Sequence, residues 1–201
     1  MKRVLISDNI WDFDLSAALQ EISEQRREQA LKFKHAQGQR LCVLAYKLLK
    51  QALREEYGVT DNPLFKYNES GKPSLVGHPE IFFNLSHCKE AAACVVSDHP
   101  VGIDVESLRQ YKDSLAEYCM NDDELRQIKF SDNPDEEFIR LWTMKEATIK
   151  LLGTYVSDKV TGKKTKSRTS STGRVVKNAT SAATRTITKE LTRDILGNLV
   201  K

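Results

Sequence analysis

The sequence predicts a mixed α/β fold, and three observations lead to this expectation. A stripe of leucine and alanine residues with helical spacing runs through residues 41–53. Three short apolar runs, separated by turn residues, follow between residues 81 and 106. A second helical pattern, with clear start and stop signals, fills residues 133–153. Helical periodicity combined with short apolar runs of this kind is typical of a sheet covered by helices.

The first 60 residues are expected to form one strand and two helices. Residues 2–6, which contain an apolar run of three residues at 4–6, predict a strand. Apolar positions in residues 15–33 recur at helical spacing and predict one amphipathic helix with a charged middle. Gly38 is expected to interrupt the chain before the second helix. That helix should end near Gly58, because glycine readily adopts the left-handed conformation that caps a helix.

The middle of the chain reads as turns followed by strands. Residues 61–75 carry Asn-Pro and Ser-Gly-Lys-Pro and predict turns. Residues 81–87 and 91–100 are strand-like runs, and VGIDVE at residues 101–106 follows directly. As a strand, VGIDVE would place its aliphatic side chains on one face and Asp104 with Glu106 on the other. Two carboxylates on one face indicate either a solvated surface or a bound cation.

The last helix should begin at Asp132 or Asn133, with Pro134 in its first position and acidic residues in its first turn. It carries Glu146 and Lys150, which are four residues apart and therefore share one side. If this helix packs across the 101–106 strand, Glu146 would join the two carboxylates there. Three carboxylates suit a hard divalent cation such as Mg²⁺. The alternative is an exposed Glu–Lys pair and an unrelated acidic strand.

Composition indicates an ordinary soluble protein with an uneven distribution of charge. The 201 residues carry a net charge of +3. Residues 1–153 hold 20 basic against 25 acidic residues, and residues 154–201 hold 11 against 3. No secretory signal or membrane-spanning stretch is expected at the start or elsewhere. The four cysteines form no Cys-x-x-Cys pair, so neither a disulfide framework nor a zinc site is expected, and the reducing cytoplasm fits best.

Four motifs occur in a fixed order along the chain. They are GKP at 71–73, FNLSH at 83–87, VGIDVE at 101–106 and LWTMKEATIK at 141–150. In this order they resemble the signature of the Sfp-type 4′-phosphopantetheinyl transferases, of the holo-acyl-carrier-protein synthase superfamily. The resemblance covers roughly residues 1–153. It implies two similar α/β halves, here residues 1–100 and 101–153, with residues 154–201 as a basic tail and the second half incomplete if the tail does not close it.

The resemblance also implies a reaction. Such enzymes transfer the 4′-phosphopantetheine group of coenzyme A to a serine of an apo acyl or peptidyl carrier protein and release adenosine 3′,5′-bisphosphate. Mg²⁺, or Mn²⁺ in its place, would be bound by Asp104, Glu106 and Glu146. Catalysis would rest on Asp104, Glu146 and Lys150, with Glu146 also placed to accept the serine proton.

A set of basic and polar residues would contact coenzyme A by the same resemblance. Without it, each of them would be taken for a structural or surface residue. The set comprises Arg26, Arg40, Lys72, Ser86, His87, Lys145 and Lys150.

The carrier protein is expected to dock on the helical segment at residues 113–130. Carrier proteins are acidic, and this segment is acidic too, so apolar contacts should dominate there. The candidates are Leu115, Tyr118, Cys119, Met120 and Leu125, for which core packing is an equal alternative. The protein is expected to be a monomer. Neither a membrane nor a nucleic acid is expected as a partner.

Residues 154–201 depart from the expected pattern. They are rich in Thr, Ser, Lys and Arg and hold a single aromatic residue, Tyr155. Three explanations stay open: a divergent folded end, a disordered basic extension, or sequence foreign to the family. The competing functions are a non-catalytic, basic-tailed protein that binds anionic partners such as nucleic acid, and a coenzyme A-binding homologue without turnover.

Overall fold

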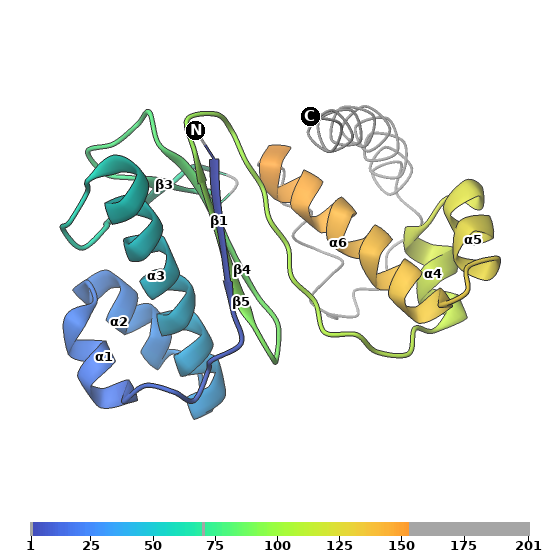
Figure 1. Ribbon diagram of the computed structural model, residues 1–201, viewed down its shortest axis with the longest axis horizontal. Helices are drawn as coiled ribbons and strands as arrows, with labels where there is room; N and C mark the ends of the chain where they lie inside the picture. Colours follow the sequence, from blue (N-terminus) through green and yellow to red (C-terminus); the bar gives the residue numbers. More distant parts are fainter. Residues whose placement is uncertain (1, 70, 153–201) are drawn as a thin grey trace, which may run out of the picture. The chain divides into compact units, whose positions relative to one another are not determined.

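The computed structural model describes residues 2–69 and 71–152, which form two compact units (Figure 1). Of the described residues, the first unit takes 2–107 and 149–152, and the second takes 108–148. The division into similar halves at residue 100 stays a prediction. The expectations for residues 154–201 lie outside the described residues. None of the described helices is both long enough and apolar enough to cross a membrane.

The first unit is built on a three-stranded antiparallel sheet. Its strands lie in the order β1, β5, β4. The bounds are β1 (Lys2–Ser7), β4 (Phe82–His87) and β5 (Ala92–Ser97). The strands expected at the start of the chain and at residues 81–87 and 91–100 are therefore confirmed.

A small hairpin precedes β4 in the segment that was expected to form turns only. It pairs β2 (Phe65–Tyr67) with β3 (Pro73–Leu75). The turn signals were correct, because the Asn68 side chain accepts a hydrogen bond from the Lys72 amide at 2.8 Å and closes the turn. The two strands were missed because each is only three residues long.

The helix expected at residues 15–33 is in fact two helices, α1 (Leu15–Glu21) and α2 (Glu24–Leu31). The chain is extended at Ile22, and the Ser23 hydroxyl caps α2 by accepting a hydrogen bond from the Arg26 amide at 3.3 Å. A serine that satisfies a free amide at a helix start favours a new helix over continuation of the old one. The expectation of a single helix was wrong because this cap outweighs the apolar periodicity.

The long helix α3 (Ala36–Tyr57) contains Gly38, so the expected interruption there was wrong. Gly38 serves a packing purpose instead, because a Cβ at this position would lie 2.7 Å from Cδ1 of Phe33. The end of the helix was predicted correctly. Gly58 adopts φ 66° and donates its amide to the carbonyls of Leu53 and Arg54.

Helix α3 packs along one face of the sheet, with α1 and α2 on its other side (Figure 1). Tyr46, Leu49 and Leu53 of α3 are completely buried, and they belong to the same core as Phe83 of β4 and Val96 of β5. The opposite face of the sheet is exposed at one edge and buried at the other. At β1 it leaves Val4 46% and Ile6 63% exposed, whereas at β4 Asn84 and Ser86 are buried.

Residues 101–106 were expected to form a strand, and this expectation was wrong. The segment is not assigned to any strand of the described residues. Instead, the Ile103 amide donates to Asn84 Oδ1 at 2.9 Å, and the Val105 amide donates to Ser86 Oγ at 3.3 Å. The alternation of apolar and polar residues is the same as in a strand, but within the described part of the chain the amides of residues 103 and 105 bond to side chains of β4.

The second unit consists of α4 (Asp113–Cys119), α5 (Asp122–Lys129) and the first part of α6 (Pro134–Leu152). Asn121 separates α4 from α5 with a capping box, in which its side chain and that of Glu124 each accept the other residue's amide. Helix α6 begins after Asn133, as expected, and the Asn133 carbonyl accepts the Glu137 amide at 3.0 Å.

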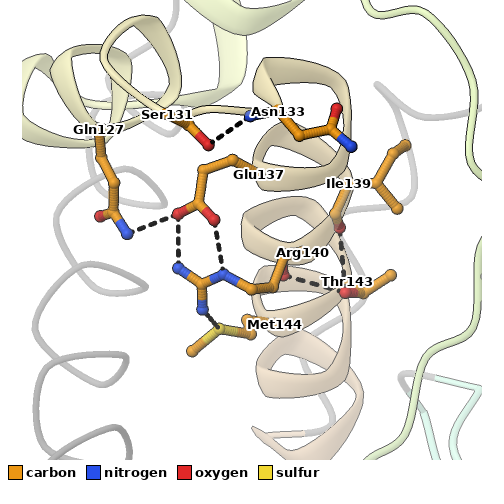
Figure 2. A network of polar contacts seen from close by, with 8 residues as sticks. All are labelled: Gln127, Ser131, Asn133, Glu137, Ile139, Arg140, Thr143 and Met144. Carbon is orange, nitrogen blue, oxygen red and sulfur yellow. Dashed lines mark hydrogen bonds and ion pairs between the residues drawn. The ribbon is translucent and has the colours of Figure 1, made fainter.

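A separate apolar core holds these three helices together. Met120, Ile128 and Phe138 are almost completely buried, and the Phe138 ring stacks on Tyr111 with centroids 5.1 Å apart. Figure 2 shows a network of polar contacts at the edge of this core, in which Gln127 of α5 reaches Glu137 of α6. Glu137 accepts hydrogen bonds from Arg140 at 2.6 and 2.9 Å and from Gln127 at 2.5 Å. The Arg140 guanidinium is the main reason that the pKa of Glu137 lies below its ordinary value.

The position of the sheet depends on α3, which leads to a first prediction. Leu49→Ala should lower the free energy of unfolding by about 2–5 kcal/mol, because it leaves a cavity in a fully buried site. Leu31→Ala is the matched control, since this leucine is 56% exposed and its loss should cost about 0.5 kcal/mol or less. Urea denaturation of both variants measures the difference. Equal losses would contradict the assignment of the core.

Candidate functional site

Three of the motifs meet in the first unit around Asp104. Lys150, in the last turn of α6, places its Nζ 2.6 Å from Asp104 Oδ1 and 2.9 Å from Ser86 Oγ. The Ser86 hydroxyl in turn donates to Asp104 Oδ1 at 2.8 Å. Helix α6 carries the LWTMKEATIK motif and is called the KEA helix below. One residue each from FNLSH, VGIDVE and the KEA helix therefore forms a closed triangle of polar contacts, which is called the Asp104 junction below.

The Asp104 junction is partly shielded from water. The Asp104 side chain is only 8% exposed and that of Lys150 is 28% exposed. Asp104 Oδ1 receives both hydrogen bonds, whereas Oδ2 is buried and has no hydrogen-bond partner among the described residues. A buried carboxylate oxygen without a donor is costly, so this atom is suited to bind a cation or a donor from a ligand.

The acidic residues expected to bind a metal fit that role by their chemistry. Carboxylate oxygens are the ligands that Mg²⁺ and Mn²⁺ prefer, and the free Oδ2 of Asp104 can supply one. Glu106 lies two residues further along the same extended segment, and Glu146 lies one helical turn before Lys150 on α6. Within residues 2–69 and 71–152, no group of three or more His, Cys, Asp or Glu side chains is arranged to hold a metal ion. Within the first unit the structure brings Asp104 to Lys150 and Ser86.

His87, the residue after Ser86, lines a hollow of about 330 Å³ in the first unit. The start of α3 contributes Gln37 and Gly38 to the wall, and the positive end of a helix dipole favours anions. The remaining lining residues are Phe33, Lys34, His35, Leu41, Cys88 and Lys89. The hollow thus combines a helix N-terminus with two lysines and two histidines, a composition that suits a phosphate group.

The His87 ring packs edge-on against Phe33, with centroids 6.2 Å apart. Burial by the surrounding protein lowers the pKa of His87, and the positive charges of Arg26 and Lys150 lower it further. His87 is therefore neutral near pH 7 in the free protein. An anion bound beside it would favour the protonated ring and raise its pKa.

Sequence reasoning missed three basic residues of this hollow, Lys34, His35 and Lys89. The signals were present as Lys-Phe-Lys-His at residues 32–35 and His-Cys-Lys at residues 87–89. Each run looks like ordinary surface charge by itself. Only the fold brings the loop before α3 next to the end of β4.

Arg26 and Arg40 do not line the hollow, and both use their guanidinium groups to hold the chain. Arg26 donates to the Cys42 carbonyl at 2.7 and 3.2 Å and thereby ties α2 to α3. Arg40 donates to the Phe13 carbonyl at 2.7 Å, and its guanidinium lies 5.0 Å from the centre of the Trp11 ring. These contacts give both arginines a structural function in the first unit.

Two of the three lysines expected near coenzyme A, Lys72 and Lys145, have different surroundings. Lys72 donates to the Leu151 carbonyl at 2.7 Å, at the C-terminal end of α6, and burial lowers its pKa. Lys145 belongs to the second unit, where its side chain is 7% exposed and its Nζ lies 2.8 Å from Glu124 Oε2. Lys145 is therefore the partner of a buried carboxylate between α5 and α6.

The segment expected to dock the carrier protein divides into exposed and buried residues. Leu115 is 38% and Tyr118 is 55% exposed on α4. Met120 is completely buried, so its alternative assignment as core is confirmed. Cys119 and Leu125 pack against the same core while partly accessible.

Comparison with known proteins gives a consistent result. Residues 100–193 match the 4'-phosphopantetheinyl transferase superfamily. The chain is 30% identical over 135 residues to 4'-phosphopantetheinyl transferase gsp of Aneurinibacillus migulanus, covering 66% of this chain and 56% of that protein. It is 31% identical over 139 residues to psf-1 of Bacillus pumilus, covering 68% and 60%. It is 32% identical over 151 residues to HetI of a Nostoc species, covering 70% and 62%.

In each case the chain spans less than two thirds of the relative's length. The matched region nevertheless includes VGIDVE and the KEA helix, the two motifs that supply Asp104 and Lys150 to the junction. By this match and by these relatives, the chain is similar to the 4'-phosphopantetheinyl transferase superfamily.

Proposed function

We propose that this protein transfers the 4′-phosphopantetheine group of coenzyme A to a serine of an apo acyl or peptidyl carrier protein. The observation that carries the proposal is the Asp104 junction, in which three separate motifs supply a carboxylate, a hydroxyl and an ammonium group. The Oδ2 atom of Asp104 is left for a further cation. This combination suits a reaction at a pyrophosphate, where negative charge must be bound and stabilised.

Coenzyme A would bind with a phosphate group in the hollow beside His87. Lys34, His35 and Lys89 would attract the phosphate, and the amides at the start of α3 would donate to it. Ser86 and Lys150 connect this region to Asp104, because Ser86 directly precedes His87 on β4. Lys72 would lie along the nucleotide. Arg26, Arg40 and Lys145 belong to the proposed set by resemblance alone, since their charged groups are bonded within the protein.

Mg²⁺, or Mn²⁺ in its place, would be held by Asp104, Glu106 and Glu146, and it would supply positive charge to the pyrophosphate. The serine hydroxyl of the carrier protein forms a bond to the phosphorus that bears the pantetheine arm. The bond from that phosphorus to the bridging pyrophosphate oxygen breaks, and adenosine 3′,5′-bisphosphate leaves. Glu146 would accept the serine proton, and Lys150 would donate to a phosphate oxygen as its charge grows.

The carrier protein would dock on the second unit through the exposed Leu115 and Tyr118 of α4. Because coenzyme A and apo carrier proteins are found together in the cytoplasm, we place the activity there, with a monomer as the active form. A coenzyme A-binding homologue without turnover is the second candidate.

The direct test is a mass spectrum of an apo acyl carrier protein incubated with this protein, coenzyme A and Mg²⁺. We expect a gain of one phosphopantetheine group on the carrier, and we expect EDTA to abolish that gain. Calorimetry with coenzyme A should run in parallel. Binding of coenzyme A without transfer to several apo carriers would identify the homologue without turnover.

Substitution at the junction gives a second prediction. Asp104→Asn should reduce transfer by about 10²–10³-fold, because it removes the negative charge that faces the cation while keeping an acceptor for Ser86. Lys150→Met should reduce transfer less, since it removes one donor to the phosphates. Asp61→Asn, which changes an exposed acid of the same unit, is the control and should leave the rate unchanged. Full activity in Asp104→Asn would refute the assignment of the site.

The pKa of His87 gives a third prediction. Its pKa lies below the ordinary value in the free protein, so the ring must gain a proton to attract a phosphate. Coenzyme A affinity should therefore fall as the pH rises from 6.5 to 8.5, because fewer complexes can then hold a protonated His87. His87→Gln should bind more weakly at pH 6.5 and show a flatter dependence on pH. Parallel curves for the two proteins in calorimetry would exclude a phosphate contact at His87.

A further inference from the structure

We propose that Asn84 is a positioning residue, which fixes the segment that presents Asp104. The Asn84 side chain is buried, with 6% of the residue exposed, and its Oδ1 accepts the Ile103 amide at 2.9 Å. Ile103 directly precedes Asp104. The amide of the residue that follows Asp104, Val105, is held in turn by Ser86.

The positions of these residues on β4 explain how the segment is held. Asn84 and Ser86 are two residues apart on one strand, so both side chains project from the same face of the sheet. They accept the amides of residues 103 and 105, which are also two apart. Two side chains of β4 thus bind alternate amides of the segment, as a neighbouring strand would do with its carbonyls.

Two fixed amides on either side of Asp104 restrict the backbone at that residue. Lys150 and Ser86 bind only one of the two carboxylate oxygens, so they do not by themselves define the direction of Oδ2. The Asn84 contact is the one hydrogen bond among those described that anchors the N-terminal side of Asp104. Loss of this contact should therefore make the backbone at residues 103 and 104 more mobile. The Asp104 carboxylate would then adopt a wider range of orientations.

The alternative is that the Asn84 side chain only stabilises the fold, because a buried polar group without a hydrogen-bond partner is costly. Ser97 serves as the matched control for that alternative. It is buried to a similar degree, at 3% exposed, on the same face of the same sheet, and its Oγ accepts the His99 amide at 3.1 Å. Its hydrogen bonds are with Asp98 and His99, away from residues 101–107, so it should contribute stability alone.

The first experiment measures amide hydrogen exchange in the full-length protein. In Asn84→Ala the Ile103 amide should exchange about tenfold faster or more, while the amides of β4 and β5 keep their protection. Asn84→Asp keeps an acceptor at the same place and should restore the protection. Ser97→Ala should leave Ile103 unchanged. Unchanged exchange at Ile103 in Asn84→Ala would overturn the proposal, and so would faster exchange of the whole sheet together.

The second experiment measures Mn²⁺ affinity by electron paramagnetic resonance, without coenzyme A or carrier protein. It rests on the proposed function. Asn84→Ala should weaken Mn²⁺ binding about tenfold, as supporting residues behind metal ligands do, whereas Ser97→Ala should not. If both variants weaken binding equally, Asn84 acts only through stability and the positioning role is wrong.

The two experiments separate failure of this inference from failure of the proposed function. A wild-type protein that binds no Mn²⁺ would refute the proposed metal site, and the exchange rate at Ile103 would still decide the role of Asn84. If Asn84→Ala does not fold, Asn84→Ser replaces it, because its shorter side chain removes the acceptor from the Ile103 amide while keeping a polar atom. Retained protection in that variant would overturn the proposal.

Discussion

The packing of α3 against the β1-β5-β4 sheet is the interaction on which the rest of the first unit depends. Burial of Tyr46, Leu49 and Leu53 fixes the helix on one face and so fixes β4 at the edge of the sheet. Asn84 and Ser86 of β4 point the other way, and their side chains hold the amides of residues 103 and 105. The start of the same helix forms part of the hollow beside His87. One packed helix therefore determines both parts of the candidate site.

The two lysines of the KEA helix, Lys145 and Lys150, form ion pairs that differ in their exposure to water. Lys145 meets Glu124 in the second core, next to the capping box of α5, and its contribution is to the arrangement of the three helices. Lys150 meets Asp104 with more than a quarter of its side chain exposed, where a ligand can reach it. A charged pair closed off from water is costly to disturb, whereas a partly open pair can exchange partners. The difference in exposure explains why only Lys150 is assigned to the chemistry.

The sequence predicted those parts of the fold that local physics determines. The strands β1, β4 and β5 follow from apolar runs, and the ends of α3 and α6 follow from Gly58 and from Asn133 with Pro134. It did not predict the break at Ser23, because a single cap opposed a longer periodic pattern. It also gave the wrong state for residues 101–106, since alternation of side chains does not reveal whether the partner is a backbone or a row of side chains. The order of the motifs indicated that they share one site, but it did not predict the direct contacts among Asp104, Ser86 and Lys150. The hollow depends on tertiary contact between residues 33–38 and 87–89, whose basic runs look like surface charge when each is read alone.

Phe33 and Gly38 have a consequence for anyone who wishes to reshape the hollow. The Phe33 ring occupies the space where a Cβ of residue 38 would lie, and the same ring supports His87 from the edge. The two positions therefore share one fixed volume and cannot be varied independently. A library that diversifies residue 38 alone would yield displaced rings and disordered histidines rather than smaller hollows. Paired diversification, with a smaller residue at 33 whenever 38 gains a side chain, is the route to variants with a hollow of altered shape.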